Sequence, residues 1–89
     1  MIALEQSERS PGKLRGRVGP LHVHANLLDE ADDGAPDPSG AVEWYVTAVA
    51  EEYRNALLEG YSDSLDEARA AITSGLDALR QAIEDALVT

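Results

Sequence analysis

Two histidines, His22 and His24, are the first residues whose type and spacing could do chemistry. Two apart on a strand, both imidazoles lie on one face and could meet the same metal ion. A protein zinc site needs three or four ligands with supporting groups, but the chain has only two histidines and no cysteine. We therefore expect no metal site, and we interpret both histidines as solvent-facing strand residues.

The segment that starts at Asp29 has part of a calcium-binding pattern. Asp29, Asp33 and Gly34 fall at the first, fifth and sixth positions of an EF-hand loop. The other positions do not match, because Ala31 stands third and Gly40 stands twelfth, where a bidentate glutamate belongs. The sequence predicts a solvated acidic loop that holds neither calcium nor another cofactor.

Carboxylates are the most abundant chemical groups, with 17 Asp and Glu in 89 residues. A catalytic general acid needs a secluded environment that raises its pKa, and a chain of this size builds one small core with little room for a cleft. The absence of cysteine removes thiolate nucleophiles. We predict that the chain is not an enzyme and has no catalytic residues.

The net charge of −10 is large for so small a chain and is unevenly placed. Residues 1–17 carry four basic and two acidic groups, whereas residues 18–89 carry three basic and fifteen acidic groups. A surface of this sign repels nucleic-acid phosphates and attracts basic protein patches. We expect no direct nucleic-acid binding; a role in solubility alone is the alternative.

The elements that must present these groups begin after a loose segment. Residues 1–13 mix Ser, Pro, Gly and charges without a period, which indicates a flexible tail before a single small domain over 14–89. Apolar and polar side chains alternate from 21 to 27, the pattern of a half-buried strand. Prolines and glycines in 29–40 indicate a surface loop.

Residues 42–61 fit two interpretations. Segment 42–49 is rich in β-branched and aromatic residues, and a turn would return the chain as a strand over 55–61. The fold is then α+β, a three-stranded antiparallel sheet followed by one long helix packed on it. Val42, Tyr45 and Val49 also recur at helical spacing, so an all-α three-helix bundle stays open.

The last element is a long helix over about 65–87. Ser64 and Glu67 form a capping box, in which each side chain satisfies a free backbone N–H at the helix start. Apolar residues then recur at steps of three and four. At about 1.5 Å per residue the helix is longer than the predicted strands, so it bends near 73–75 or its end packs on another subunit.

The segment from Glu59 to Ile72, EGYSDSLDEARAAI, resembles the strand-to-helix junction of HicB-like antitoxins and of short phage and mobile-element proteins. The resemblance implies a βββα domain that covers a small basic RNA-cleaving toxin. Small acidic phage proteins, among them anti-CRISPR inhibitors, resemble the chain in size, charge and element order.

We expect a small, acidic interaction protein of phage or mobile-element type. We expect it to be cytoplasmic, since no stretch is long and apolar enough for a signal peptide or a membrane span. It would bind and block a basic nucleic-acid-binding surface on a target protein, as a nucleic-acid mimic does. A homo-oligomeric structural or assembly protein, such as a homodimer, and an antitoxin-like partner of a small basic toxin are the alternatives. The predicted contact residues are Asp29, Glu30, Asp32, Asp33, Asp37, Glu51, Glu52, Asp63, Asp66 and Glu67.

Overall fold

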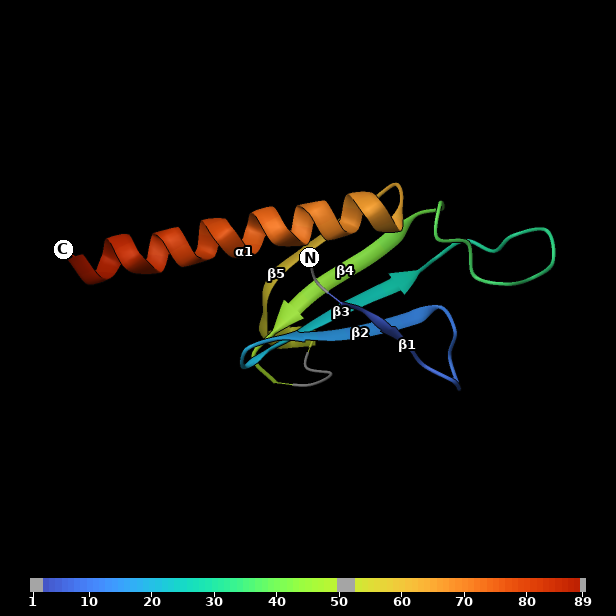
Figure 1. The fold of residues 1–89 in the computed structure, drawn as a ribbon, viewed down its shortest axis with the longest axis horizontal. Coiled ribbons are helices and arrows are strands. Elements are labelled where there is room, and N and C mark those ends of the chain that lie inside the picture. Colours follow the sequence, from blue (N-terminus) through green and yellow to red (C-terminus); the bar gives the residue numbers. More distant parts are fainter. Residues whose placement is uncertain (1–2, 50–52, 89) are drawn as a thin grey trace.

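The computed structural model describes residues 3–49 and 53–88. These residues form an antiparallel sheet of five strands in the order β1-β2-β3-β4-β5, followed by one long helix (Figure 1). The predicted α+β class is confirmed, and the three-helix bundle is wrong. The elements are β1 (Glu5–Gln6), β2 (Lys13–Val18), β3 (Leu21–Leu27), β4 (Val42–Thr47), a short 3-10 turn η1 (Tyr53–Asn55), β5 (Ala56–Ser62) and α1 (Leu65–Val88).

The prediction of three strands is wrong because it leaves out β1 and β2. In β2, Gly16 stands between the buried Leu14 and the exposed Val18, and glycine weakens the strand pattern. Packing favours glycine at position 16, because a Cβ built there would lie 2.9 Å from Leu4 Cδ2. β1 pairs with β2 from within the segment 1–13; the flexibility of that segment stays a prediction.

The three predicted strands correspond to β3, β4 and β5. The side chains of β4 divide between the two faces of the sheet, which explains why the helical interpretation of 42–61 is wrong. Val42, Trp44 and Val46 belong to the core, and Tyr45 and Thr47 contact His24 on the other face. A register shift between Val46 and Thr47 interrupts the pairing of β4 with β5. Gly60 in β5 lets Trp44 pack closely, since a Cβ there would lie 2.6 Å from Trp44 Cζ2.

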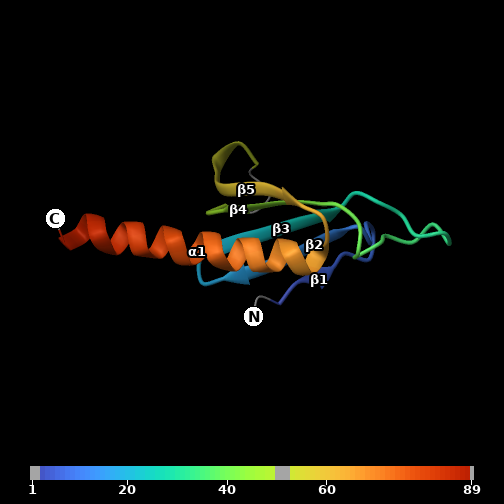
Figure 2. The same ribbon diagram turned by 90° about the horizontal axis from the view of Figure 1, so that it is seen from above.

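The core lies between one face of the sheet and the first half of α1. Figure 2 shows this half of the helix lying over the sheet. Val23 and Val46 from the sheet and Ala68 and Ile72 from α1 are completely buried. On α1, Ala68 and Ile72 are the buried residues of the helix. The second half of α1 therefore contributes little to this core.

The start of α1 is confirmed at Leu65. Ser64 Oγ accepts a hydrogen bond from the Glu67 amide at 3.2 Å, and the Glu67 carboxylate accepts one from the Asp63 amide at 3.2 Å. The helix runs past the end of the sheet without a sharp bend (Figure 1), and the molecule measures 54 × 22 × 22 Å. Gly75 allows close packing on the sheet, where a Cβ would lie 3.1 Å from Leu58 Cδ1.

Candidate functional site

The acidic loop between β3 and β4 is held in shape by its own side chains. Asp29 Oδ2 accepts a hydrogen bond from the Ala41 amide at 2.8 Å, and this bond closes the base of the loop. Asp33 Oδ1 accepts the Ala35 amide at 3.0 Å. Such aspartate turns replace regular secondary structure as partners for backbone amides, so the loop has a defined conformation.

A backbone hydrogen bond joins the loop to the start of α1. The Leu65 amide donates to the Pro38 carbonyl oxygen at 2.8 Å. Figure 1 shows the loop and the start of α1 at the same end of the molecule. Segments 29–40 and 63–67 contain five and three carboxylates respectively and no Lys or Arg. We call this set the acidic end: Asp29, Glu30, Asp32, Asp33, Asp37, Asp63, Asp66 and Glu67.

The structure thus brings eight of the ten predicted contact residues to one end, and Glu51 and Glu52 lie outside the described residues. The eight carboxylates differ in what they do. Those of Asp29, Asp33, Asp37 and Glu67 accept hydrogen bonds from the protein itself. Asp32 and Asp63 are exposed, and no hydrogen bond to their carboxylates is found within residues 3–49 and 53–88.

Asp37 has a lowered pKa, because the Ser39 hydroxyl and then the Ser39 amide donate hydrogen bonds to its carboxylate. The two bonds measure 2.6 Å from Ser39 Oγ and 2.9 Å from the Ser39 amide. Hydrogen bonds to a carboxylate stabilise its charged form. Asp37 therefore keeps its negative charge to a lower pH than an ordinary aspartate does.

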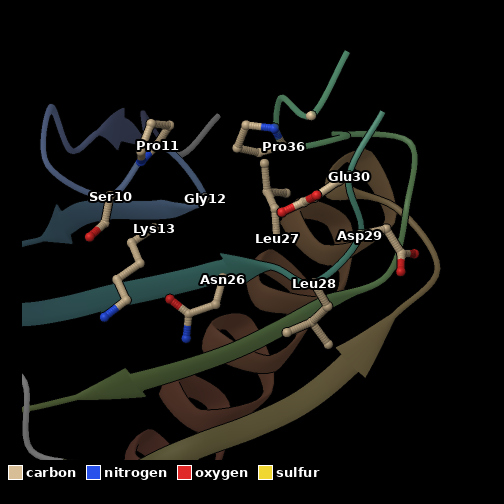
Figure 3. A pocket seen from close by; sticks show the side chains of 11 residues that line it. Ser10, Pro11, Gly12, Lys13, Asn26, Leu27, Leu28, Asp29, Glu30 and Pro36 are labelled. Carbon is tan, nitrogen blue, oxygen red and sulfur yellow. The ribbon is translucent and has the colours of Figure 1, made fainter. Parts of the chain in front are cut away.

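A shallow hollow of about 540 Å³ separates the β1–β2 hairpin from the acidic loop (Figure 3). Pro11 stands on the β1–β2 hairpin and Pro36 on the acidic loop, and the Asp29 side chain points away from both rings. The Leu27 amide donates to the Gly12 carbonyl oxygen at 2.6 Å and ties the end of β3 to the β1–β2 hairpin. The hollow is a feature of the acidic end, with an apolar patch beside carboxylates.

The face of the sheet that α1 does not cover carries charged and aromatic residues that the sequence analysis left out of the site. Neighbouring strands place Arg15 opposite His24, His24 opposite Tyr45, and Tyr45 opposite Glu59. Ser7, Arg9, Ser10, Lys13, Arg15 and Tyr45 line a hollow of about 440 Å³ there. The alternation of Lys13, Arg15 and Arg17 with apolar residues and Gly16 is the signal that could have revealed the basic side chains of this face.

His24 is a structural residue of this face. Its ring is 1% exposed and stacks on Tyr45 with the centroids 4.3 Å apart, and its Nε2 lies 3.3 Å from Thr47 Oγ1. Tyr53 packs edge-on against Tyr45. The expectation that His24 faces solvent is wrong, because aromatic packing covers it.

No group of three or more His, Asp or Glu side chains that could hold a metal ion is found among the described residues. Among the same residues, no helix is both long enough and apolar enough to cross a membrane. Comparison of the chain with protein-family models, curated proteins and solved structures finds no match. The antitoxin-like role that the resemblance of residues 59–72 implies stays a prediction.

Proposed function

We propose that this chain is a cytoplasmic interaction protein whose acidic end occupies a basic, nucleic-acid-binding surface of a target protein and blocks it. The observation that supports this proposal most is the hydrogen bond from Leu65 to Pro38. This bond brings the five carboxylates of segment 29–40 and the three of segment 63–67 to one end of a long molecule.

The arrangement of charge favours a partner with a positive surface. Eight of the 17 acidic residues lie in the acidic end, in two segments that contain no basic residue. Asp32 and Asp63 are exposed, and the conformation of the loop is set by other carboxylates. Charges held on a preformed backbone bind with less loss of conformational entropy than charges on a mobile tail. Complementary potentials also speed association and make it sensitive to salt.

The experiment that tests this function is a pull-down with the tagged chain at low and high salt, followed by competition against nucleic acid. Each recovered protein is loaded with fluorescent duplex DNA or RNA, and the chain is titrated in while anisotropy is recorded. We expect recovery of a nucleic-acid-binding protein, and we expect the chain to displace the labelled nucleic acid. Binding should weaken at least about tenfold between about 50 and 500 mM salt.

Two variants of equal charge show whether the acidic end is responsible. D32N/D63N neutralises two carboxylates of the acidic end, and E5Q/E59Q neutralises two elsewhere, so each has a net charge of −8 instead of −10. We expect only D32N/D63N to compete poorly. Direct binding of nucleic acid by the chain, or equal competition by both variants, would be incompatible with the proposal.

A further inference from the structure

The second half of α1 extends beyond the sheet and keeps its apolar side. Leu79, Ile83 and Leu87 continue the spacing of the core residues Ala68 and Ile72 along one face. Ile83 is 52% exposed and Leu87 is 82% exposed. We call residues 79–88 the overhang. Its apolar face has no partner within the described part of the chain that buries it.

A groove of about 730 Å³ opens next to the overhang. It lies between α1 and the end of the β2–β3 hairpin, and its lining residues are Arg17, Val18, Leu21, Thr73, Leu76, Asp77 and Arg80. Leu76 packs at the edge of the core and precedes Leu79 by one turn. The groove and the apolar face of the overhang therefore form one continuous surface.

We infer that this surface binds a second copy of the chain in a two-fold symmetric dimer. The two overhangs pack antiparallel, with Leu79 of each copy opposite Ile83 of the other. In the same register, Leu87 of the second copy lies level with Gly75 of the first copy. Leu87 is therefore between the levels of Thr73 and Leu76 of that copy. Since Thr73 and Leu76 line the groove, Leu87 of each copy enters the groove of the other.

The geometry of packed helices agrees with this arrangement. Packed helices lie about 8–10 Å apart, so a second overhang beneath the first continues the layer that the sheet occupies. Its end then meets the β2–β3 hairpin, where Val18 and Leu21 are partly exposed. Each copy supplies both the overhang and the groove, as a self-complementary two-fold interface requires.

Charge also favours a second copy at this place. Arg17 and Arg80 lie on the groove, and the end of α1 that enters it carries Glu84 and Asp85. Arg80 is already paired within its own helix, with Asp77 at 2.7 Å and with Glu84 at 2.9 Å. Arg17 is therefore the groove cation that meets Glu84 and Asp85 of the second copy. The acidic ends lie at the opposite end of the 54 Å molecule, where their mutual repulsion in the dimer is small.

The size of the surface suits a dimer of moderate affinity. Ten helical residues span about 15 Å, which with the groove gives roughly 1,000 Å² of total buried area, the low end of specific interfaces. A small domain gains much from such additional burial. Dimerisation also presents two acidic ends on one particle, which strengthens binding to a partner with two basic sites.

Sedimentation equilibrium over about 1 to 500 µM protein tests the dimer at the affinities expected for this area. We expect the mass to rise from 9.5 kDa to twice that value. Ile83→Glu should weaken dimerisation at least about tenfold, because it places a charge at the centre of the interface. Ala78→Glu adds the same charge on another side of α1 and should behave as the unsubstituted chain. Circular dichroism checks that both variants keep their helix.

Cysteine crosslinking tests the register, since the chain has no cysteine of its own. A mixture of the Val18→Cys and Leu87→Cys variants should oxidise to a covalent heterodimer, and neither variant alone should crosslink efficiently. Replacing Leu87→Cys by Gln81→Cys should abolish the crosslink. A mass of 9.5 kDa at every concentration would overturn the inference and point to a different protein on this face. Dimerisation that is unaffected by Ile83→Glu, or absence of the Val18–Leu87 crosslink, would overturn it as well.

Discussion

The Leu65 amide donates a hydrogen bond to the Pro38 carbonyl oxygen at 2.8 Å, and this contact holds the acidic loop against the start of α1. A free backbone N–H at the start of a helix is normally satisfied by a side chain, by water or by a ligand. Here the loop itself satisfies it. The bond therefore connects the shape of the loop to the position of the helix, and it assembles the acidic end from two separate segments.

Ser39→Ala should raise the pKa of Asp37 toward its ordinary value of 3.8, because the Ser39 hydroxyl is the main cause of the lowered pKa. NMR titration of the carboxyl carbons measures the change. With a lowered pKa in the folded state, the stabilisation from Asp37 is present above pH 3.8 and is lost as the pH falls through the lower folded value. Ser74→Ala on α1 is the control and should leave this pKa unchanged.

Glu43→Gln should lower the pKa of Tyr61 toward its ordinary value of 10.0. Tyr61 Oη donates to Glu43 Oε2 at 3.1 Å, and this bond and the Glu43 charge are the main causes of the raised pKa. The corresponding stabilisation is present below pH 10.0 and is lost as the pH rises through the folded value. NMR titration of the tyrosine ζ carbons reports it, and an unchanged Tyr61 in the variant would refute the assignment.

Ile72→Ala should cost about 2–5 kcal/mol of unfolding free energy, because it leaves a cavity in the core. Ile72 is completely buried, and Ile83 on the same helix is 52% exposed. Ile83→Ala is therefore the matched control, with an expected change within about 0.5 kcal/mol in the monomer. Urea unfolding at a low protein concentration measures both. Equal losses in the two variants would mean that the overhang belongs to the core of a single copy.

Gly16→Ala should loosen β1 from the sheet. The added methyl group would lie 2.9 Å from Leu4 Cδ2 and would contact the Ala3 carbonyl oxygen, so the backbone near residues 3–4 must move. Hydrogen exchange should become faster in segments 4–7 and 13–15, with β4 unchanged. Normal protection of β1 in the variant would show that this close approach is not needed.

Local sequence patterns predict those elements that have local causes. Alternation from 21 to 27 predicts β3, and Ser64 with Glu67 predicts the start of α1, since both signals depend on neighbouring residues alone. β2 is not predicted because its pattern is interrupted by Gly16. Glycine is needed there for the close packing of Leu4, which is distant in sequence and close in space. No local pattern reports such a contact.

The candidate site likewise has features that local sequence predicts and features that depend on tertiary contacts. Composition predicts which segments are acidic, and the contact between Leu65 and Pro38 that brings them together depends on the tertiary fold. The burial of His24 is also a tertiary effect, because Tyr45 and Thr47 come from the neighbouring strand. A strand pattern predicts that His24 lies on the face opposite the core, and aromatic packing on that face then removes it from solvent.

The most direct test of the central claim compares the two variants of equal charge in binding to a recovered basic partner at one ionic strength. D32N/D63N and E5Q/E59Q both have a net charge of −8. We expect the dissociation constant of D32N/D63N to exceed that of E5Q/E59Q by at least about tenfold, because only the former changes charges at the acidic end. Equal dissociation constants would show that total charge, and not the acidic end, determines binding, and would contradict the proposed function.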